Sequence, residues 1–416
     1  MDRAENDLQS IPVRVDGETL RLLAPAVFLF VLPLAHVTAL RSIAFAVSVA
    51  WLLWTWRVYP TPGIPLKTPF AAWLVLALLS LIWAIHPAYS LGEIKAEILY
   101  GFLSFLIFFK ATRSRREIDL WFCTIAASAL VVGSFAAMDF LRGLNPYDVG
   151  MHGGTLYYAG YLNTVFPVLA AVVLLRAGWF RVFSICLGAF LLFTAFGSTS
   201  RAVWLGFLVE LAVFGALYVG YMGFRPVVKT IVIATSLSSL VALSAGLLYV
   251  TKEKLSLSGG PAAIIAQAVK LDHRPKLWAD SIMFIKERPM TGAGFGRMVL
   301  GEELVAQQQD RNHSHAHNIF LNYALQLGVL GPFVILLLFF ATTREFWRLI
   351  KSADRELKVL GIAGVSMVGG VLSQGMVEDI FVRHLAWLFW ALVGMTLGYA
   401  MNRGGQFPSP ARPAAK

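Results

Sequence analysis

Residues 230–250 read TIVIATSLSSLVALSAGLLYV and carry no charged side chain. A helix needs about 20 mainly apolar residues to cross the hydrocarbon core of a bilayer, so this stretch is long enough by itself. Across all 416 residues, 57% are hydrophobic and only 14% are charged. This composition excludes a soluble globular enzyme, a disordered chain and a disulfide scaffold, and it predicts an all-α polytopic membrane protein.

Further apolar runs bring the prediction to about 12 transmembrane helices. In chain order the runs are 22–40, 42–56, 70–85, 94–111, 119–140, 157–175, 182–196, 202–222, 230–250, 317–343, 357–376 and 383–401. The tenth run contains Gly331 and Pro332, and we expect a kink there because proline removes a backbone donor.

Lysine and arginine predict how the chain lies in the membrane. With the N-terminus in the cytoplasm, 21 of the 35 basic residues fall in cytoplasmic segments and only 5 in short outer loops. This is the expected positive-inside bias. The net charge of +11 therefore indicates loops beside anionic lipid, and no nucleic acid partner is implied.

This orientation divides the chain into four parts. A short cytoplasmic tail and nine spans make up 1–250, and 251–316 is a long periplasmic loop that holds the other 9 basic residues. The last three spans occupy 317–402, and 403–416 is a second cytoplasmic tail. Both termini are therefore expected in the cytoplasm.

The long outer loop is expected to be helical. Pro261 opens one short helix and Pro275 a second, because proline is favoured in the first turn of a helix. The glycine-rich stretch 292–296 predicts a flexible turn, and a third helix is expected at 298–309. A charged helical segment above an apolar bundle suggests a lid over a cavity at the level of the lipid head groups, where the substrate would be borne on a lipid.

Three histidines, His313, His315 and His317, lie within five positions just before the tenth span. No His-Glu-x-x-His pattern and no nearby cysteine accompany them, so a metal site is not expected. A structural role at the helix start stays open. We favour general base catalysis, because the ordinary pKa of histidine lies near working pH.

Arg201 follows Ser198, Thr199 and Ser200 on the outer side of the eighth span. It could anchor the helix at the interface, or it could bind phosphate, since a guanidinium group matches phosphate oxygens with paired bonds. Arg274 and Lys276 could add to such a phosphate clamp from the loop. Arg311, near the histidines, is a further candidate for substrate binding.

These residues together resemble a known family. The segments HAHNIFL at 315–321 and LGVLG at 327–331 resemble the signature of the bacterial O-antigen ligase and polymerase superfamily. The segment STSR at 198–201 resembles it too. Other residues that fit the pattern are Trp204, Gly206, Arg274, Trp278, Pro289, Gly292 and Gly294.

The resemblance implies a membrane glycosyltransferase of the GT-C type, with its active site facing the periplasm at the bacterial inner membrane. Such ligases move O-antigen from undecaprenyl diphosphate onto a sugar hydroxyl of lipid A-core, with inversion and without a metal or other cofactor. The essential histidine of the family falls on His317, and its essential arginines fall on Arg201 and Arg274. His313 and His315 lie beside the motif position and are kept as substrate-binding candidates, so the identity of the base stays open among the three.

Two other functions stay open. An O-antigen polymerase would use the same donor and a similar histidine, but would elongate a glycan. A transporter or lipid flippase would place an essential ionisable group in mid-membrane, and only Glu210 fits that description. The ligase predicts sensitivity to mutation at the outer rim, and the transporter predicts it at Glu210.

Overall fold

A computed structural model of the chain describes residues 17–58, 63–144, 150–198, 200–308, 314–379, 381 and 383–403. Within these ranges the chain forms helices and turns and no strand, which confirms the expected all-α class. Eight of the described helices are long and apolar enough to cross a membrane, as expected for a polytopic membrane protein. They are α2 (Thr38–Val58), α6 (Arg115–Leu141), α7 (Gly154–Leu175), α8 (Gly178–Gly197), α9 (Arg201–Tyr221), α10 (Pro226–Lys254), α16 (Arg355–Gly375) and α17 (Arg383–Arg403).

Three of the remaining expected spans are short or irregular helices. The runs 22–40, 70–85 and 94–111 correspond respectively to α1 (Gly17–Val31), to α3 (Lys67–Ser80), and to the series α4 (Pro87–Glu93), η1 (Ile94–Leu99) and α5 (Tyr100–Ala111). Pro33 follows the end of α1 closely, and Pro87 stands at the start of α4, where its missing N–H costs no helical bond. The helices α1 and α3 thus end before the hydrophobic runs 22–40 and 70–85 do.

The tenth expected span, 317–343, is two helices, α14 (Ile319–Leu327) and α15 (Leu330–Ile350). The interruption lies at Gly328, whose φ is 64°, and not at Pro332 as expected. A Cβ on Gly328 would lie 2.6 Å from the backbone of Met290, so only glycine fits here. Pro332 falls in the first turn of α15, a position that suits proline.

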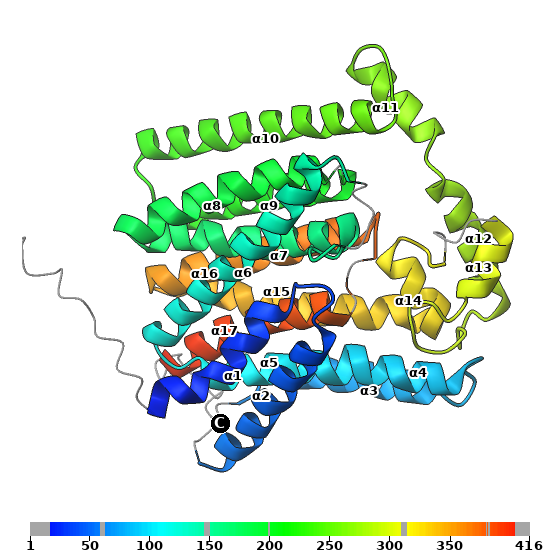
Figure 1. Ribbon diagram of the computed structural model, residues 1–416, viewed down its shortest axis with the longest axis horizontal. Coiled ribbons are helices and arrows are strands. Elements are labelled where there is room, and N and C mark those ends of the chain that lie inside the picture. The colour runs from blue at the N-terminus through cyan, green and yellow to red at the C-terminus, as the bar shows by residue number, and fades with distance from the viewer. Residues whose placement is uncertain are drawn as a thin grey trace, which may run out of the picture.

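Helix α17 lies at the centre of the bundle, with 83% of its membrane window buried. It packs along α5, and Gly394 and Gly398 make this close approach possible. A Cβ on these glycines would lie 2.2 Å and 2.3 Å from the carbonyl oxygens of Phe105 and Phe109. Figure 1 shows the helices lying side by side, with α10 at one edge of the bundle.

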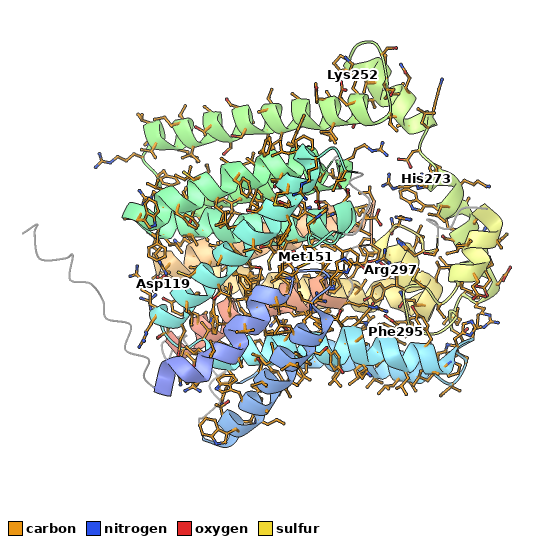
Figure 2. All side chains as sticks on the ribbon, viewed as in Figure 1. Asp119, Met151, Lys252, His273, Phe295 and Arg297 are labelled. Carbon is orange, nitrogen blue, oxygen red and sulfur yellow. The ribbon has the colours of Figure 1, made fainter. Side chains whose placement is uncertain are left out.

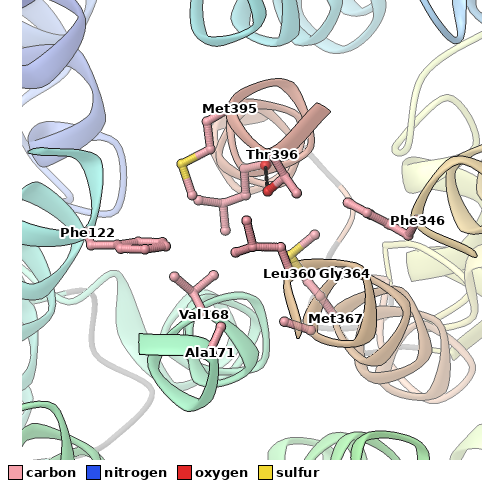
Figure 3. A pocket seen from close by; sticks show the side chains of 11 residues that line it. Phe122, Val168, Ala171, Phe346, Leu360, Gly364, Met367, Met395 and Thr396 are labelled. Atoms are coloured by element: carbon pink, nitrogen blue, oxygen red, sulfur yellow. Dashed lines mark hydrogen bonds between the residues drawn. The ribbon is translucent and has the colours of Figure 1, made fainter. Parts of the chain in front are cut away.

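The bundle core is closely packed. A small cavity of about 20 Å³ lies among α6, α7, α15, α16 and α17, and its lining is almost entirely apolar (Figure 3). The one hydroxyl drawn there, on Thr396, donates to the carbonyl of Leu392 at 2.9 Å. This cavity is too small and too apolar to hold a substrate.

The two ends of the bundle differ. One end carries ion pairs in segments that the sequence predicts to be cytoplasmic: Arg21 with Glu117 at 2.6 Å, and Arg176 and Arg403 with Glu356 at 2.8 Å and 2.6 Å. The other end carries the helices of the long loop, α11 (Pro261–Lys270), α12 (Arg274–Glu287) and α13 (Gly301–Gln308), together with α14 (Figure 1). In Figure 2, Asp119 marks the first end, and His273 and Arg297 mark the second.

Candidate active site

His317 lies just before α14 in an uncommon backbone conformation. Its φ is 47°, in the left-handed region that few residues other than glycine adopt. Its N–H donates to Nδ1 of His315 at 3.1 Å, and the indole of Trp278 donates to the carbonyl of Ala316 at 3.0 Å. On the other side, the side chain of Asn318 caps α14 by accepting from two backbone N–H groups. The surrounding hydrogen bonds therefore fix the backbone that aims the His317 ring.

Glu378 is the partner of the His317 ring. Its Oε1 lies 2.6 Å from Nδ1, and both side chains are mostly buried, with 13% and 15% of their surface exposed. When Nδ1 donates to this carboxylate, the lone pair of the neutral ring lies on Nε2. A carboxylate in this place orients the ring and stabilises the imidazolium that forms when Nε2 takes up a proton.

His315 is buried beside His317, with its ring centroid 4.0 Å from that of His317. One nitrogen of its ring faces the N–H of His317, and the other faces the guanidinium of Arg297. The lone pair of the neutral His315 ring accepts the N–H of His317 at Nδ1, so a proton added there would displace that hydrogen bond and place an imidazolium beside the Arg297 cation. The geometry therefore favours His317 over His315 as the proton acceptor.

The glycine-rich stretch 292–296 positions Arg297. The sequence predicts a turn here, and the structure has turns and bends that are buried and hydrogen-bonded: Ala293 donates to the carbonyl of Leu325 at 2.8 Å, and Gly294 to that of Gln326 at 3.0 Å. Gly294 has a φ of 109°, and a Cβ there would lie 2.5 Å from Ala84. The close fit of this backbone against its neighbours holds Arg297 next to His315.

Arg201 and Arg274 meet at one carboxylate, that of Asp272. The distance from Asp272 Oδ2 is 2.9 Å to Arg274 and 3.9 Å to Arg201. Burial by itself raises the pKa of Asp272, but the backbone N–H and charge of Arg274 and the charge of Arg201 outweigh it, so the pKa lies below its ordinary value. Two guanidinium groups and one carboxylate leave a net positive charge, which suits an anionic ligand.

The histidine and the arginines are linked through two consecutive residues. Nε of Arg274 donates to the carbonyl of Val377 at 2.8 Å, and Glu378, the next residue, contacts His317. The short loop after α16 thus contacts both the start of α14 and the start of α12. It brings a candidate base and a candidate anion clamp to the same end of the bundle.

The other candidates from the sequence are placed differently. Lys276 is exposed on α12, in the first turn of that helix, and its role stays a prediction. Arg311 and His313 lie outside the described residues, so the structure gives no position for them. His273, next to Arg274, brings its ring to 6.2 Å from that of His317.

His315, His317 and Glu378 are close enough to hold a metal ion, because their ligand atoms lie within 4.8 Å of one another. In the arrangement described, however, Nδ1 of His317 is engaged with Glu378, and His315 faces two donors. A cation would also meet the nearby charge of Arg297. These contacts favour acid–base chemistry, and the metal-independent reading stays a prediction.

Sequence reasoning missed Glu378, Asp272 and Arg297. Asp272 stands two residues before Arg274, and Glu378 and Asp379 form an acidic pair in a short outer loop between two spans. Acidic residues are uncommon in the short loops expected on the outer side, so this acidic pair was a signal in the sequence for Glu378. Nothing local in the sequence marks Arg297 as a neighbour of His315.

Comparison with known proteins finds a family similarity in this region. Residues 186–337 match the family model described as O-antigen ligase. The match contains Arg201, Arg274 and His317, and it ends before Glu378. No curated protein matches the chain.

Proposed function

We propose that this chain, which carries a domain of the O-antigen ligase and polymerase superfamily, is an O-antigen ligase. It would be an inverting, metal-independent glycosyltransferase of the GT-C type at the bacterial inner membrane. The donor is O-antigen on undecaprenyl diphosphate, and the acceptor is a sugar hydroxyl of lipid A-core on the periplasmic side. The loop 251–316 covers the site and admits the two glycans.

His317 is the general base in this proposal. Nε2 takes the proton of the acceptor hydroxyl while Nδ1 donates to Glu378, which stabilises the imidazolium as it forms. Glu378 touches neither substrate, so it acts as a positioning residue. Loss of a general base costs about 10²–10⁴ in rate.

The acceptor oxygen then attacks the anomeric carbon of the first donor sugar, on the face opposite the diphosphate. A new C–O bond forms, and the bond between the anomeric carbon and the phosphate oxygen breaks with its electron pair leaving on undecaprenyl diphosphate. The acceptor proton stays on His317 until it passes to solvent or to the departing phosphate. Attack from the opposite face inverts the configuration of the anomeric carbon.

Arg201 and Arg274 bind the diphosphate and stabilise the charge that develops on it. In the structure they share Asp272, whose carboxylate keeps two like charges together before the donor binds. Loss of one such group costs about 10²–10³ in rate, the range measured when one donor that stabilises developing charge is removed from an active site.

One observation carries the proposal. Val377 and Glu378, adjacent in the chain, contact Arg274 and His317 respectively, so the base and the leaving-group clamp are coupled in one small site. A transporter or lipid flippase has no need for a histidine–carboxylate pair beside paired arginines. A transferase that deprotonates a hydroxyl and releases a diphosphate needs both.

A transfer assay tests the proposal. Purified protein, lipid-diphosphate-linked glycan and lipid A-core are mixed with excess EDTA, and glycan-bearing lipid A-core is read on a gel for wild type and His317→Ala. We expect product with wild type and a loss of about 10²–10⁴ with the variant. Longer lipid-linked glycans in place of lipid A-core product would show a polymerase instead. No transfer of any kind, with verified substrates, would favour the transporter.

A further inference from the structure

The loop after α16, residues 376–379, is held at both of its ends by one helix. On α14, Nδ2 of the cap residue Asn318 donates to the carbonyl of Met376 at 2.9 Å. Four residues further along, Nδ2 of Asn322 donates to Oδ2 of Asp379. Residues four apart lie on the same face of a helix, so one face of α14 grips the first and the last residue of the loop.

Glu378 stands between these two contacts. Its partner His317 directly precedes the cap residue of α14, so the base and its carboxylate belong to the two segments that these contacts join. A shift of the loop relative to α14 would lengthen the 2.6 Å contact between Oε1 and Nδ1. Hydrogen bonds weaken as they leave their preferred geometry, so the position of the loop bears directly on the base.

The contact between Asn322 and Asp379 is buried, with 0% and 1% of these residues exposed. Oδ1 of each residue has no hydrogen-bond partner among the described residues. Burying polar groups costs free energy, which the bond between the two side chains offsets only in part. A buried polar pair of this kind fixes a position more strictly than an apolar contact would.

A positive charge also faces Asp379. Burial raises the pKa of Asp379, while the charge of Arg297 and the hydrogen bond from Asn322 oppose this rise. Arg297 is itself held by the backbone before it, because the N–H of Gly296 donates to Oε1 of Gln326 at 2.8 Å. The carboxyl group at the end of the loop is therefore anchored by an amide on α14 and by a guanidinium from the long outer loop.

We propose that Asn322 and Asp379 are positioning residues of the transferase, which fix the loop so that Glu378 meets Nδ1 of His317. The proposal rests on the proposed function, because it concerns the base of that reaction. Both side chains are buried away from the substrates, so they act on the rate of transfer and not on the binding of donor or acceptor.

An exchange of the two side chains tests this arrangement. Asn322→Asp alone sets two carboxyl groups against each other. We expect kcat to fall by about 10–100-fold, the cost seen when the partner that orients a metal-bound histidine is removed. Adding Asp379→Asn restores an amide beside a carboxyl group, with the donor now on the loop, and should recover most of kcat. The KM for donor and acceptor should stay unchanged in both proteins.

Asn402→Asp is the control for the added charge. Asn402 lies on α17 at the other end of the bundle, where it donates to the carbonyl of Thr112 at 3.2 Å. Its kcat should equal that of wild type. The unfolding temperature is measured for every variant, which separates loss of the fold from loss of position. An exchanged protein that is as stable as wild type but as slow as Asn322→Asp would overturn the proposal.

A second measurement shows whether Asn322 acts through Glu378. In Glu378→Gln protein, Asn322→Asp should cost no further kcat, since residues that act as a unit are not additive. A loss of the same size in both backgrounds would overturn the proposal. A rise in KM for either substrate would overturn it too, because it would assign Asn322 to binding.

The two proposals fail in different ways. If wild type transfers glycan to lipid A-core but the exchange recovers nothing, the ligase stands and the positioning role falls. If wild type makes longer lipid-linked glycans instead, the exchange is scored on that product. Recovery would then keep the positioning role while the ligase falls.

Discussion

The carboxylate of Glu378 lies 2.6 Å from Nδ1 of His317, across 61 residues of sequence. The contact joins the residue that precedes the α14 cap to the loop that follows α16. Since His317 has a positive φ and its N–H is held by His315, the ring has little freedom to turn away from Glu378. The pair therefore determines which ring nitrogen faces a substrate.

Glu378→Gln is expected to lower kcat while leaving KM for donor and acceptor unchanged. The amide keeps the size of the side chain but no longer stabilises the imidazolium, so the loss should fall within the span of about 10²–10⁴ that a general base contributes. Steady-state transfer kinetics measure it. Glu378→Asp should recover part of the activity, because a carboxylate is restored. A rise in KM alone would assign Glu378 to substrate binding.

His315→Ala is expected to weaken the site without removing the base. It leaves the partly buried N–H of His317 without its acceptor, which costs at most about 1–3 kcal/mol, and it frees the backbone that aims the His317 ring. The unfolding temperature and the transfer rate should both fall, but the transfer rate should fall less than it does for His317→Ala. The double variant should be no slower than His317→Ala, since residues that act as a unit are not additive. A slower double variant would give His315 a separate role.

Metal removal is expected to leave transfer unchanged, and added zinc is expected to inhibit it. The ligand atoms of His315, His317 and Glu378 lie within 4.8 Å of one another, so Zn²⁺ can capture the base when it is supplied in excess. Transfer assays with EDTA, with Zn²⁺, and with Zn²⁺ followed by EDTA distinguish the cases. Activity that EDTA abolishes and Zn²⁺ restores would make the three residues a catalytic metal site.

Asp272 is expected to stabilise the loop in a pH-dependent way. Burial raises the pKa of Asp272, but Arg274 and Arg201 lower it by more than that. The pKa in the folded protein therefore lies below that of the unfolded chain. A carboxylate with a lowered pKa stabilises the fold when the pH is above the pKa of the unfolded chain, about 3.9. This contribution disappears as the pH falls through the pKa of the folded protein. The unfolding temperature of Asp272→Asn should thus lie below that of wild type at pH 5–7, and the gap should narrow below about pH 4. Glu302→Gln, an exposed carboxylate on α13, is the control and should show no such gap.

The fold followed from hydrophobic runs wherever a run coincided with one helix. Residues 230–250 are an example, since α10 contains the whole run. The runs did not predict the helix breaks at Gly328 and after α1. Hydrophobicity alone does not show where the backbone turns because it meets a neighbour, as Gly328 meets Met290. Those breaks depend on tertiary contacts.

The residues of the candidate site also fall into those that the sequence predicts and those that depend on tertiary contacts. Arg201, Arg274 and His317 stand in recognisable local motifs, and the structure brings all three to one end of the bundle. Glu378 and Arg297 act on the histidines only through contacts between segments far apart in the chain. A single sequence does not show such pairings, because it does not say which distant segments meet.

Glu210→Gln separates the transferase from the transporter. Glu210 packs so tightly on α16 that a Cβ on Gly370 would lie 2.0 Å from its Oε1, and glutamine keeps that shape. The transferase needs no charge there, so transfer to lipid A-core should be unchanged. A transporter that moves ions or protons through a mid-membrane carboxylate would lose its activity with this variant. Gly370→Ala is the contrasting variant: the added methyl displaces the Glu210 side chain from its place against α16, so its unfolding temperature should fall while that of Glu210→Gln stays near wild type. Loss of transfer in a stably folded Glu210→Gln protein would show that the carboxylate takes part in the activity, and the base at His317 would then not account for it alone.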